Sequence, residues 1–414
     1  MIKSIKIGAL AIAGAIALAA CGGGSSNSAL VVGTDLPLQG ASADASTATN
    51  NAIALYLEKQ GGKAGKYTVT IKQYDDSTAA KGAWDDAQCA KNAQDHVANA
   101  AEVAVMGTYN SGCAKIEVPV LNQDPTGPML MVSHANTNPG LTVSWDPGEP
   151  EKYYPGGTRN YARVVPNDIY QGTADAQYTF QEAKKTKCAV LNDNQTYGQG
   201  IAKSFADEFA KQGGTVVVNE AWDAKQTSYT ALFQKIKAAG ADCVFFGGIY
   251  DNNGGTLVKD AVAVLGDNAS FFKMAPDGFS GYPDLQGMPQ AEGLHLSFAG
   301  KSLDGMVKGG GAAGQFVADY KTKYGVDPAS SYSIYGASAM QVILKAIAAS
   351  DGTRKGVTAA LLGGSSPVCL TDAESITGVG FCIDPKTGDV DKKSVTIQTM
   401  TGGKETDLKV WDVQ

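Results

Sequence analysis

The fold is decided by the stretch Cys188-Ala189-Val190-Leu191-Asn192-Asp193-Asn194-Gln195-Thr196-Tyr197-Gly198-Gln199-Gly200. Its first four residues form a short apolar run bounded by polar ones, which is typical of a strand buried in a parallel sheet. A helical pattern follows over about 200–211, and a second apolar run, 215–218, comes after it. Strand, helix and strand in this order predict a βαβ unit.

The same alternation extends in both directions along the chain. We expect strands at 30–33, 67–74, 103–106, 129–132, 161–165, 188–191, 215–218, 243–246 and 271–274, and helices at 48–60, 79–97, 112–122, 168–184, 200–211, 229–238 and 331–349. A chain of 414 residues exceeds the usual size of one hydrophobic core. The sequence therefore predicts an α/β protein with two lobes, each built on a doubly wound parallel sheet.

Three crossings between the lobes are expected, near Pro166, Ser297 and Lys393. The predicted N-terminal lobe comprises 29–166 and 298–392, and the predicted C-terminal lobe comprises 167–297 and 393–414. Ligands of open α/β sheets bind beyond the carboxyl ends of the strands. Candidate binding residues are therefore sought in the loops 36–42, 107–112, 133–139 and 275–278, each of which follows an apolar strand.

The first 28 residues have the pattern of an export and anchoring signal. Lys3 and Lys6 precede an uncharged stretch, 7–20, and the run Leu18-Ala19-Ala20-Cys21 ends it. This run resembles the lipobox of bacterial lipoproteins, so we expect 1–20 to be removed and Cys21 to carry the lipid. Glycine and serine in 21–28 then form a flexible tether. The alternative is an ordinary secretory signal with a chance cysteine.

Six further cysteines lie in the body of the chain, and an exported protein can pair them. Six cysteines allow 15 pairings. Cys188 and Cys243 each open a strand that follows a helix, Cys89 and Cys113 lie on consecutive predicted helices, and Cys369 and Cys382 flank a short polar segment. We therefore predict the bridges 89–113, 188–243 and 369–382. A metal site or catalytic thiol is the alternative, but the chain has no Cys-x-x-Cys and only three histidines, so no metal and no cofactor are expected.

Charge and motifs argue against nucleic-acid binding and against catalysis. The formal net charge is −7, and the loss of Lys3 and Lys6 with the leader would make it more negative. Gly309, Gly311 and Gly314 have dinucleotide-loop spacing, but no apolar strand leads into them. No catalytic residue is predicted, and the chain is not expected to be an enzyme.

From about Leu30 to Lys409 the order of segments resembles the leucine/isoleucine/valine-binding family of substrate-binding proteins for ABC importers, which has the type I periplasmic-binding fold. The resemblance is carried by Tyr74-Asp75-Asp76, 133–142, 192–200 and Phe246-Gly247-Gly248. It implies a monomeric lipoprotein outside the cytoplasm that captures an amino acid, branched-chain or related, and delivers it to an ABC permease. A tethered sensor for a membrane receptor, or a binder of another small carboxylate or amide, is the alternative.

The resemblance also implies ligand contacts in both lobes. Ser111 at a helix start would bind the carboxylate of the amino acid, which suits the free N–H groups of a helix N-terminus. The Ala135 carbonyl would accept from the ammonium, the hydroxyl and N–H of Thr137 would serve either end of the ligand, and Asp277 would pair with the ammonium. The alternatives are an N-cap for Ser111, turn formers for Ala135 and Thr137, and an exposed loop acid for Asp277.

Aromatic residues complete the implied site. Tyr197 matches a residue that closes over the ligand. Tyr250 matches another, in a loop one residue longer than in the family, and Ser42 stands where the family carries a tyrosine. Tyr109 and His134 lie beside contact positions and could fill the space left by the missing tyrosine ring at position 42. The alternative is that they are packed surface residues.

Overall fold

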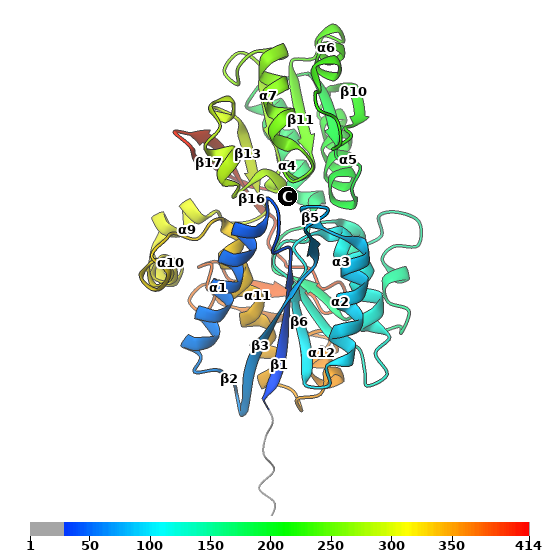
Figure 1. The fold of residues 1–414 in the computed structure, drawn as a ribbon, viewed down its shortest axis with the longest axis vertical. Helices are drawn as coiled ribbons and strands as arrows, with labels where there is room; N and C mark the ends of the chain where they lie inside the picture. Colours follow the sequence, from blue (N-terminus) through cyan, green and yellow to red (C-terminus); the bar gives the residue numbers. More distant parts are fainter. Residues whose placement is uncertain (1–28, 414) are drawn as a thin grey trace, which may run out of the picture.

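The computed structural model describes residues 29–413 and contains two α/β lobes, each built on its own sheet (Figure 1). The predicted leader, Cys21 and the tether lie outside the described residues. One sheet has the order β2 (Lys63–Ala64), β3 (Tyr67–Asp75), β1 (Leu30–Leu36), β6 (Glu102–Gly107), β7 (Leu130–Ser133) and β8 (Tyr161–Arg163). The other has the order β10 (Thr215–Ala221), β9 (Lys187–Asn192), β11 (Cys243–Gly247), β12 (Phe272–Ala275), β13 (His295–Phe298), β16 (Ser394–Thr401) and β17 (Lys404–Asp412).

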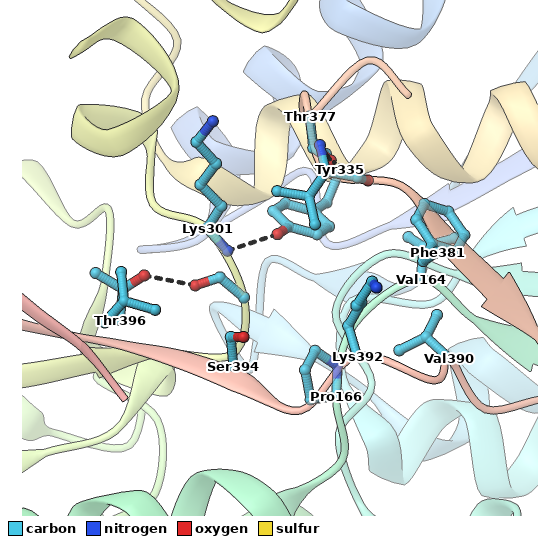
Figure 2. Close-up of a pocket in the computed structure, with 13 residues that line it drawn as sticks. Val164, Pro166, Lys301, Tyr335, Thr377, Phe381, Val390, Lys392, Ser394 and Thr396 are labelled. Carbon is cyan, nitrogen blue, oxygen red and sulfur yellow. Dashed lines mark hydrogen bonds between the residues drawn. The ribbon is translucent and has the colours of Figure 1, made fainter. Parts of the chain in front are cut away.

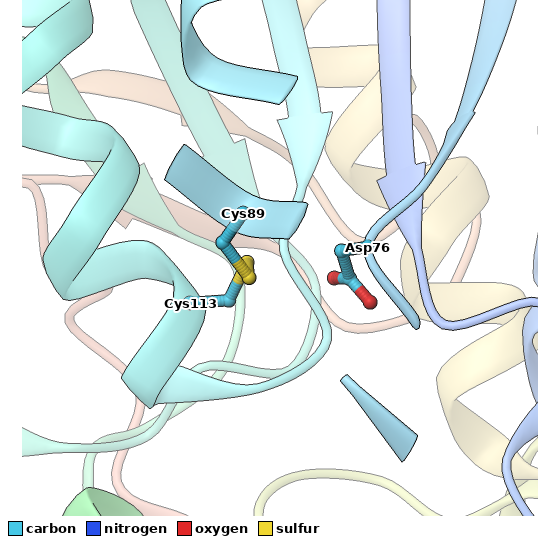
Figure 3. Close-up of side chains that lie close together, drawn as sticks. All are labelled: Asp76, Cys89 and Cys113. Carbon is cyan, nitrogen blue, oxygen red and sulfur yellow. A yellow bond between two sulfur atoms is a disulfide. The ribbon is translucent and has the colours of Figure 1, made fainter. Parts of the chain in front are cut away.

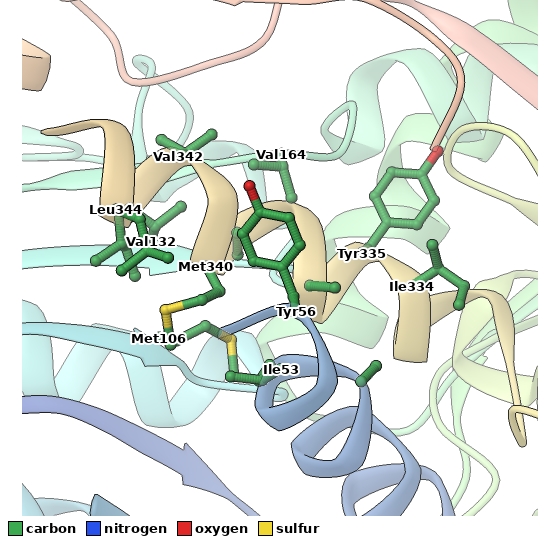
Figure 4. Close-up of a cluster of buried hydrophobic side chains, with 14 of the residues drawn as sticks. Ile53, Tyr56, Met106, Val132, Val164, Ile334, Tyr335, Met340, Val342 and Leu344 are labelled. Carbon is green, nitrogen blue, oxygen red and sulfur yellow. The ribbon is translucent and has the colours of Figure 1, made fainter. Parts of the chain in front are cut away.

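In the N-terminal lobe, alternate residues of the central strands face opposite helical layers, as period-two patterning requires. Met106 and Val132 lie in a core with α1 (Ala43–Lys59) and α11 (Ser331–Ala348), where Ile53, Tyr56 and Met340 meet them (Figure 4). The intervening strand residues Val105 and Met131 pack instead against α3 (Ser111–Asn122). Strands buried on both faces in this way read as continuous apolar runs. The lobe also contains α2 (Asp86–Ala98), α9 (Leu303–Gly309), α10 (Gly311–Tyr324) and α12 (Arg354–Leu362).

The C-terminal lobe repeats this plan. Leu191 and Phe246 face the layer of α6 (Thr230–Ala238) and α7 (Gly254–Leu265), whereas Val190 and Phe245 face α4 (Asp168–Gln181) and α5 (Thr196–Lys211). A short helix, α8 (Pro283–Gln286), and the 3-10 turns η3 (Asp277–Phe279) and η4 (Pro289–Ala291) lie between β12 and β13.

Both sheets are parallel at their centres and antiparallel at an edge. β2 pairs antiparallel with β3, and β13, β16 and β17 pair antiparallel with one another. The chain passes from the first sheet to the second after β8, leaves the second sheet after β13 to form α9 to α12 of the N-terminal lobe, and enters the second sheet again at β16. The two-lobed α/β fold predicted from the strand and helix pattern is confirmed, and the antiparallel edges add to it.

The structure contains the three predicted disulfides, 89–113, 188–243 and 369–382. Cys188 and Cys243 are directly opposite each other on the parallel neighbours β9 and β11. Cys369 and Cys382 face each other across the hairpin of β14 (Val368–Leu370) and β15 (Phe381–Ile383). The first bridge joins α2 to α3.

The prediction of a helix over 79–97 is wrong at its start. A small hairpin of β4 (Ser77–Thr78) and β5 (Ala83–Trp84) precedes the helix. Asp85 then caps α2 by accepting hydrogen bonds from the N–H groups of Ala87 and Gln88. Conversely, α1 begins five residues before the predicted position 48 and α5 begins four residues before 200. The segment 139–157 contains only the 3-10 turns η1 (Pro139–Leu141) and η2 (Glu151–Tyr153).

Within residues 29–413, no helix is long and apolar enough to cross a membrane.

Candidate functional site: a cavity between the lobes

A small cavity of about 20 Å³ lies where the two lobes meet. The N-terminal lobe supplies the loops after β6 and β7 and the first residues of α3 and α11; the C-terminal lobe supplies the start of α5 and the loops after β11 and β12. These are the carboxyl ends of parallel strands, where binding sites of open α/β sheets form. The lining residues are Tyr109, Asn110, Ser111, Ala135, Tyr197, Ile249, Asp277, Gly278 and Tyr332.

The N-terminal end of α3 forms one wall of the cavity. Ser111 is the first helical residue, and the side chain of Asn110 before it makes no capping hydrogen bond. The hydroxyl oxygen of Ser111 accepts a hydrogen bond from the Asn138 N–H at 3.3 Å, which ties α3 to the loop after β7. A helix start with this arrangement offers N–H donors and the positive end of the helix dipole to an anionic group.

The loops around this helix start are held by buried hydrogen bonds. The side-chain amide of Asn136 donates to the carbonyl oxygens of Thr108 (2.9 Å) and Tyr109 (3.0 Å). The Nη1 of the fully buried Arg163 donates to the carbonyl oxygens of Asn136 (2.8 Å) and Asn138 (3.0 Å). Because these contacts link both loops to β8, the wall is preorganised by the scaffold.

Asp277 provides the opposite wall and is the one charged group among the lining residues. It is buried, and its two carboxylate oxygens accept hydrogen bonds from the hydroxyl groups of Tyr197 and Tyr332. Burial raises the pKa of Asp277 above its ordinary value, although the two tyrosine hydroxyls act in the opposite direction. A carboxylate has about four acceptor positions, so Asp277 can also accept from a bound ammonium group.

Three aromatic rings pack beside the cavity. The ring centroids of Tyr109 and Tyr332 are 5.4 Å apart. The ring centroid of His134 lies 5.4 Å from that of Tyr109 and 5.9 Å from that of Tyr332. All three pairs meet edge to face, the geometry that aromatic quadrupoles favour. Burial lowers the pKa of His134 to about 3, so this ring is neutral near pH 7. It therefore packs as an apolar aromatic ring would.

Five of the eight predicted ligand contacts line this cavity: Tyr109, Ser111, Ala135, Tyr197 and Asp277. Thr137 lies just behind the lining; its carbonyl oxygen accepts from the Asp168 N–H at 2.8 Å, and its buried hydroxyl has no partner within the described residues. His134, predicted as a residue that could refill the site, packs behind Tyr109.

The other two predicted contacts lie elsewhere. The hydroxyl of Ser42 donates to both carboxylate oxygens of Asp251 at 2.9 Å, so this residue joins the lobes at the edge of the cleft without lining the cavity. The ring of Tyr250 packs against Phe279 and Tyr282 in the core of the C-terminal lobe. Its neighbour Ile249 lines the cavity instead, which agrees with the extra residue in this loop.

Tyr332 is the most important lining residue that the sequence did not indicate. It is the second residue of α11 and lies 55 positions from Asp277 in the chain. The helix was predicted, but nothing in its sequence marks the first turn as part of a site. Ile249 was also missed, whereas Asn110 and Gly278 lie in the predicted binding loops 107–112 and 275–278 but were not singled out as contacts.

A second and larger cavity, about 200 Å³, lies at the crossings between the lobes. Figure 2 shows Pro166, Lys301, Lys392 and Ser394 around it, with the Lys301 N–H donating to the Tyr335 hydroxyl at 2.8 Å. This cavity is distinct from the one that holds Asp277, and its walls are mostly apolar.

Comparison with known proteins identifies the family. The family model described as periplasmic binding protein matches residues 30–374. The chain belongs to this family. Its members are extracytoplasmic solute-binding proteins without enzymatic activity. A curated relative, the Leu/Ile/Val-binding protein BraC3 of Rhizobium johnstonii, is 25% identical over 316 residues, 72% of this chain and 73% of the relative.

Solved structures of similar fold include binding proteins for different solutes. A leucine-binding protein from Thermotoga maritima has a TM-score of 0.75 at 20% identity and covers 92% of this chain and 99% of its own. A solute-binding protein of an ABC transporter from Rhodopseudomonas palustris, in complex with p-hydroxybenzoic acid, has a TM-score of 0.76 at 19% identity and covers 94% of this chain and 98% of its own. The type I periplasmic-binding fold is therefore confirmed, and the choice of solute has to be argued from the site.

Proposed function

We propose that this protein captures a free amino acid, branched-chain or related, between its lobes and delivers it to an ABC importer. The α-carboxylate would bind at the start of α3, with Ser111 and Thr137 around it, and the Ala135 carbonyl oxygen would accept from the α-ammonium. The α-ammonium would pair with Asp277, and Tyr197 would close over the ligand.

The observation that carries this proposal is the pair of facing walls in one cavity. A helix N-terminus from one lobe faces a single buried carboxylate from the other. A zwitterion would satisfy both walls at once and so favour closure of the lobes around it. Because a cavity of about 20 Å³ has room for about one water molecule, the walls would stand farther apart around an amino acid than they do in this structure. The N-terminal lobe alone offers the ammonium no charged partner, and the C-terminal lobe alone offers nothing comparable to the carboxylate.

A small aromatic carboxylate is a second candidate, because Tyr109, His134 and Tyr332 surround the cavity with rings. Relatives in this fold bind benzoates. Against it stands Asp277: the lining contains no cation, so a ligand without an amine would place its own carboxylate near an unneutralised acid.

A thermal-shift screen of the full chain against amino acids, benzoates, amides and polyols tests the proposal. A bound ligand stabilises the folded protein by mass action and so raises its melting temperature. At a free ligand concentration of 100 times Kd the stabilisation is about 2.7 kcal/mol. Amino acids should shift the transition, and benzoates and polyols should not. A shift with benzoates alone would transfer the assignment to the second candidate.

Anchoring and transport form a separate part of the proposal, supported by the lipobox-like run that ends at Cys21. Radioactive palmitate should label the wild-type chain and not Cys21→Ser. Deleting the gene should abolish uptake of the bound amino acid; normal uptake with loss of a transcriptional or chemotactic response would indicate a sensor.

A further inference from the structure

A cluster of buried acidic side chains surrounds His96 in the N-terminal lobe, away from the cavity between the lobes. Asp35 comes from β1, Glu102 from β6 and Glu117 from α3, while Asp76 directly follows β3. All four carboxylates and the imidazole have no exposed surface. Charged groups without compensation are costly to bury, so this concentration requires a physical explanation.

The ring of His96 is held between two carboxylates, one at each ring nitrogen. Its Nδ1 is hydrogen-bonded to a carboxylate oxygen of Glu102. Glu102 in turn accepts from the hydroxyl of Tyr74 at 2.7 Å and from the side-chain amide of Asn99 at 2.9 Å. A carboxylate on Nδ1 fixes the ring orientation, as in the carboxylate–histidine pairs behind metal ligands, and a metal ion at Nε2 would displace the proton that Nε2 shares with Asp35.

Nε2 of His96 faces two carboxylates. It lies 3.1 Å from Oδ2 of Asp35, whose Oδ1 accepts from the Asn92 side-chain amide at 3.0 Å. One potential ligand atom from each of Asp35, His96 and Glu117 lies within 4.8 Å of the other two. Metal–ligand bonds of about 2.0–2.2 Å in a tetrahedral site place ligand atoms roughly 3.3–3.6 Å apart, so small side-chain adjustments would suffice.

Unpartnered oxygens point to a missing positive charge. Oε2 of Glu117 is buried and has no hydrogen-bond partner within the described residues, and the same holds for both carboxylate oxygens of Asp76. Asp76 faces the Cys89–Cys113 disulfide, as Figure 3 shows. Because those sulfurs are bonded to each other, they are not thiolate ligands, and the available donors are imidazole nitrogen and carboxylate oxygen.

We propose that Asp35, His96 and Glu117 bind one divalent transition-metal ion, with Zn²⁺ as the preferred ion. One imidazole and two carboxylates suit zinc, and the two negative charges balance the ion. No short-range motif indicates this set, because its members are 21 to 82 positions apart in the chain and meet only in the fold. The sequence-based expectation of no metal rested on the absence of Cys-x-x-Cys and on the presence of only three histidines.

The ion would join β1, α2 and α3 in the lobe core. Glu117 is on the same helix whose first residue, Ser111, lines the cavity between the lobes. The metal would therefore stabilise the scaffold of the solute site without touching the solute, and the inference stands whether or not an amino acid is the ligand.

The test uses the untagged full chain, stripped with EDTA and titrated with ZnCl₂ while solute is absent. We expect about one zinc per chain by elemental analysis and a rise in melting temperature of roughly 5 °C or more that EDTA reverses. MgCl₂ should not reproduce the shift. Co²⁺ in place of Zn²⁺ should give the visible absorption of a cobalt ion with nitrogen and oxygen ligands.

Glu117→Gln keeps the shape of the side chain and should weaken zinc binding by about 100-fold or more. His295→Gln, on a histidine outside the cluster, is the matched control and should bind zinc like the wild type. If zinc neither binds stoichiometrically nor stabilises the wild type, or if Glu117→Gln binds it unchanged, the proposal is wrong and the buried carboxyls are held as neutral acids. Should Glu117→Gln fail to fold, the wild-type stoichiometry and cobalt spectrum still decide.

Discussion

Asp277 is the side chain on which the proposed binding reaction depends most. It is the one charged lining residue, and both of its oxygens accept from tyrosine hydroxyls. Asp277→Asn retains the shape and an acceptor for those hydroxyls but removes the charge that the ammonium needs. We expect amino acid affinity to fall by about 100-fold, roughly 3 kcal/mol, in isothermal titration calorimetry.

The control for this variant is Asp175→Asn, which neutralises another buried carboxylate of the same lobe that lies outside the cavity lining. It should bind the amino acid like the wild type. Unchanged affinity in Asp277→Asn would place the ammonium site elsewhere.

His134 makes stability depend on pH in a defined window. Burial lowers the pKa of His134 to about 3, against about 6.5 for an unfolded chain. Between these values the unfolded state binds the proton and the folded state does not, so this contribution to stability falls as pH drops from about 6.5 to about 3. The loss is on the order of 5 kcal/mol when complete.

His134→Phe keeps a ring against Tyr109 and Tyr332 but cannot titrate. Urea unfolding at pH 7 and pH 4 should show a smaller loss of stability in this variant than in the wild type. Equal losses in both proteins would mean that His134 is protonated in the folded state.

At the scale of elements, the disulfides differ in their burial and so in their reactivity. Cys369 is exposed at the edge of a two-stranded hairpin, whereas the four cysteines of the other bridges are buried. Thiol–disulfide exchange requires access to a sulfur. Mild reduction of the native protein, followed by alkylation and peptide mapping, should therefore open 369–382 and leave 89–113 and 188–243 intact. Opening of a buried bridge first would contradict this packing.

The elements that could be predicted are those buried on both faces. The apolar runs that begin at Cys188 and Cys243 are recognisable as strands because both faces of each strand pack against helices. The same pattern led to the prediction of the disulfide between them, since the two cysteines begin neighbouring strands. The hairpin β4–β5 was missed because its strands are two residues long and carry no alternating pattern. The local strand propensity of such a short segment is too weak to show that the predicted helix should begin later in the chain.

At the scale of the whole molecule, contacts between the lobes determine the closed state. Ser42 donates to Asp251 across the cleft, and Asn138 donates to the Thr196 carbonyl oxygen at 3.0 Å. Neither interaction could be read from the sequence, because each joins residues that meet only when the lobes close. Tyr332 is hidden for the same reason: its hydroxyl reaches Asp277 across the cleft.

Ser42→Ala removes one of these contacts and leaves Asp251 with one donor fewer in the closed state. We expect a larger radius of gyration in small-angle scattering without solute, and an affinity lower by about tenfold, because part of the binding energy then drives closure. Saturating solute should restore the compact form. A variant as compact as the wild type without solute would show that this contact does not set the equilibrium.

The central claim is that one zwitterion joins the two lobes through Asp277 and the start of α3. Calorimetric titration of the full chain with an amino acid identified by the thermal screen, and with the same molecule lacking only its amino group, tests it most directly. We predict binding of the amino acid and affinity lower by about 100-fold or more for the deaminated analogue, because Asp277 then faces a carboxylate ligand without its ammonium. Equal affinity for the two molecules would contradict the account.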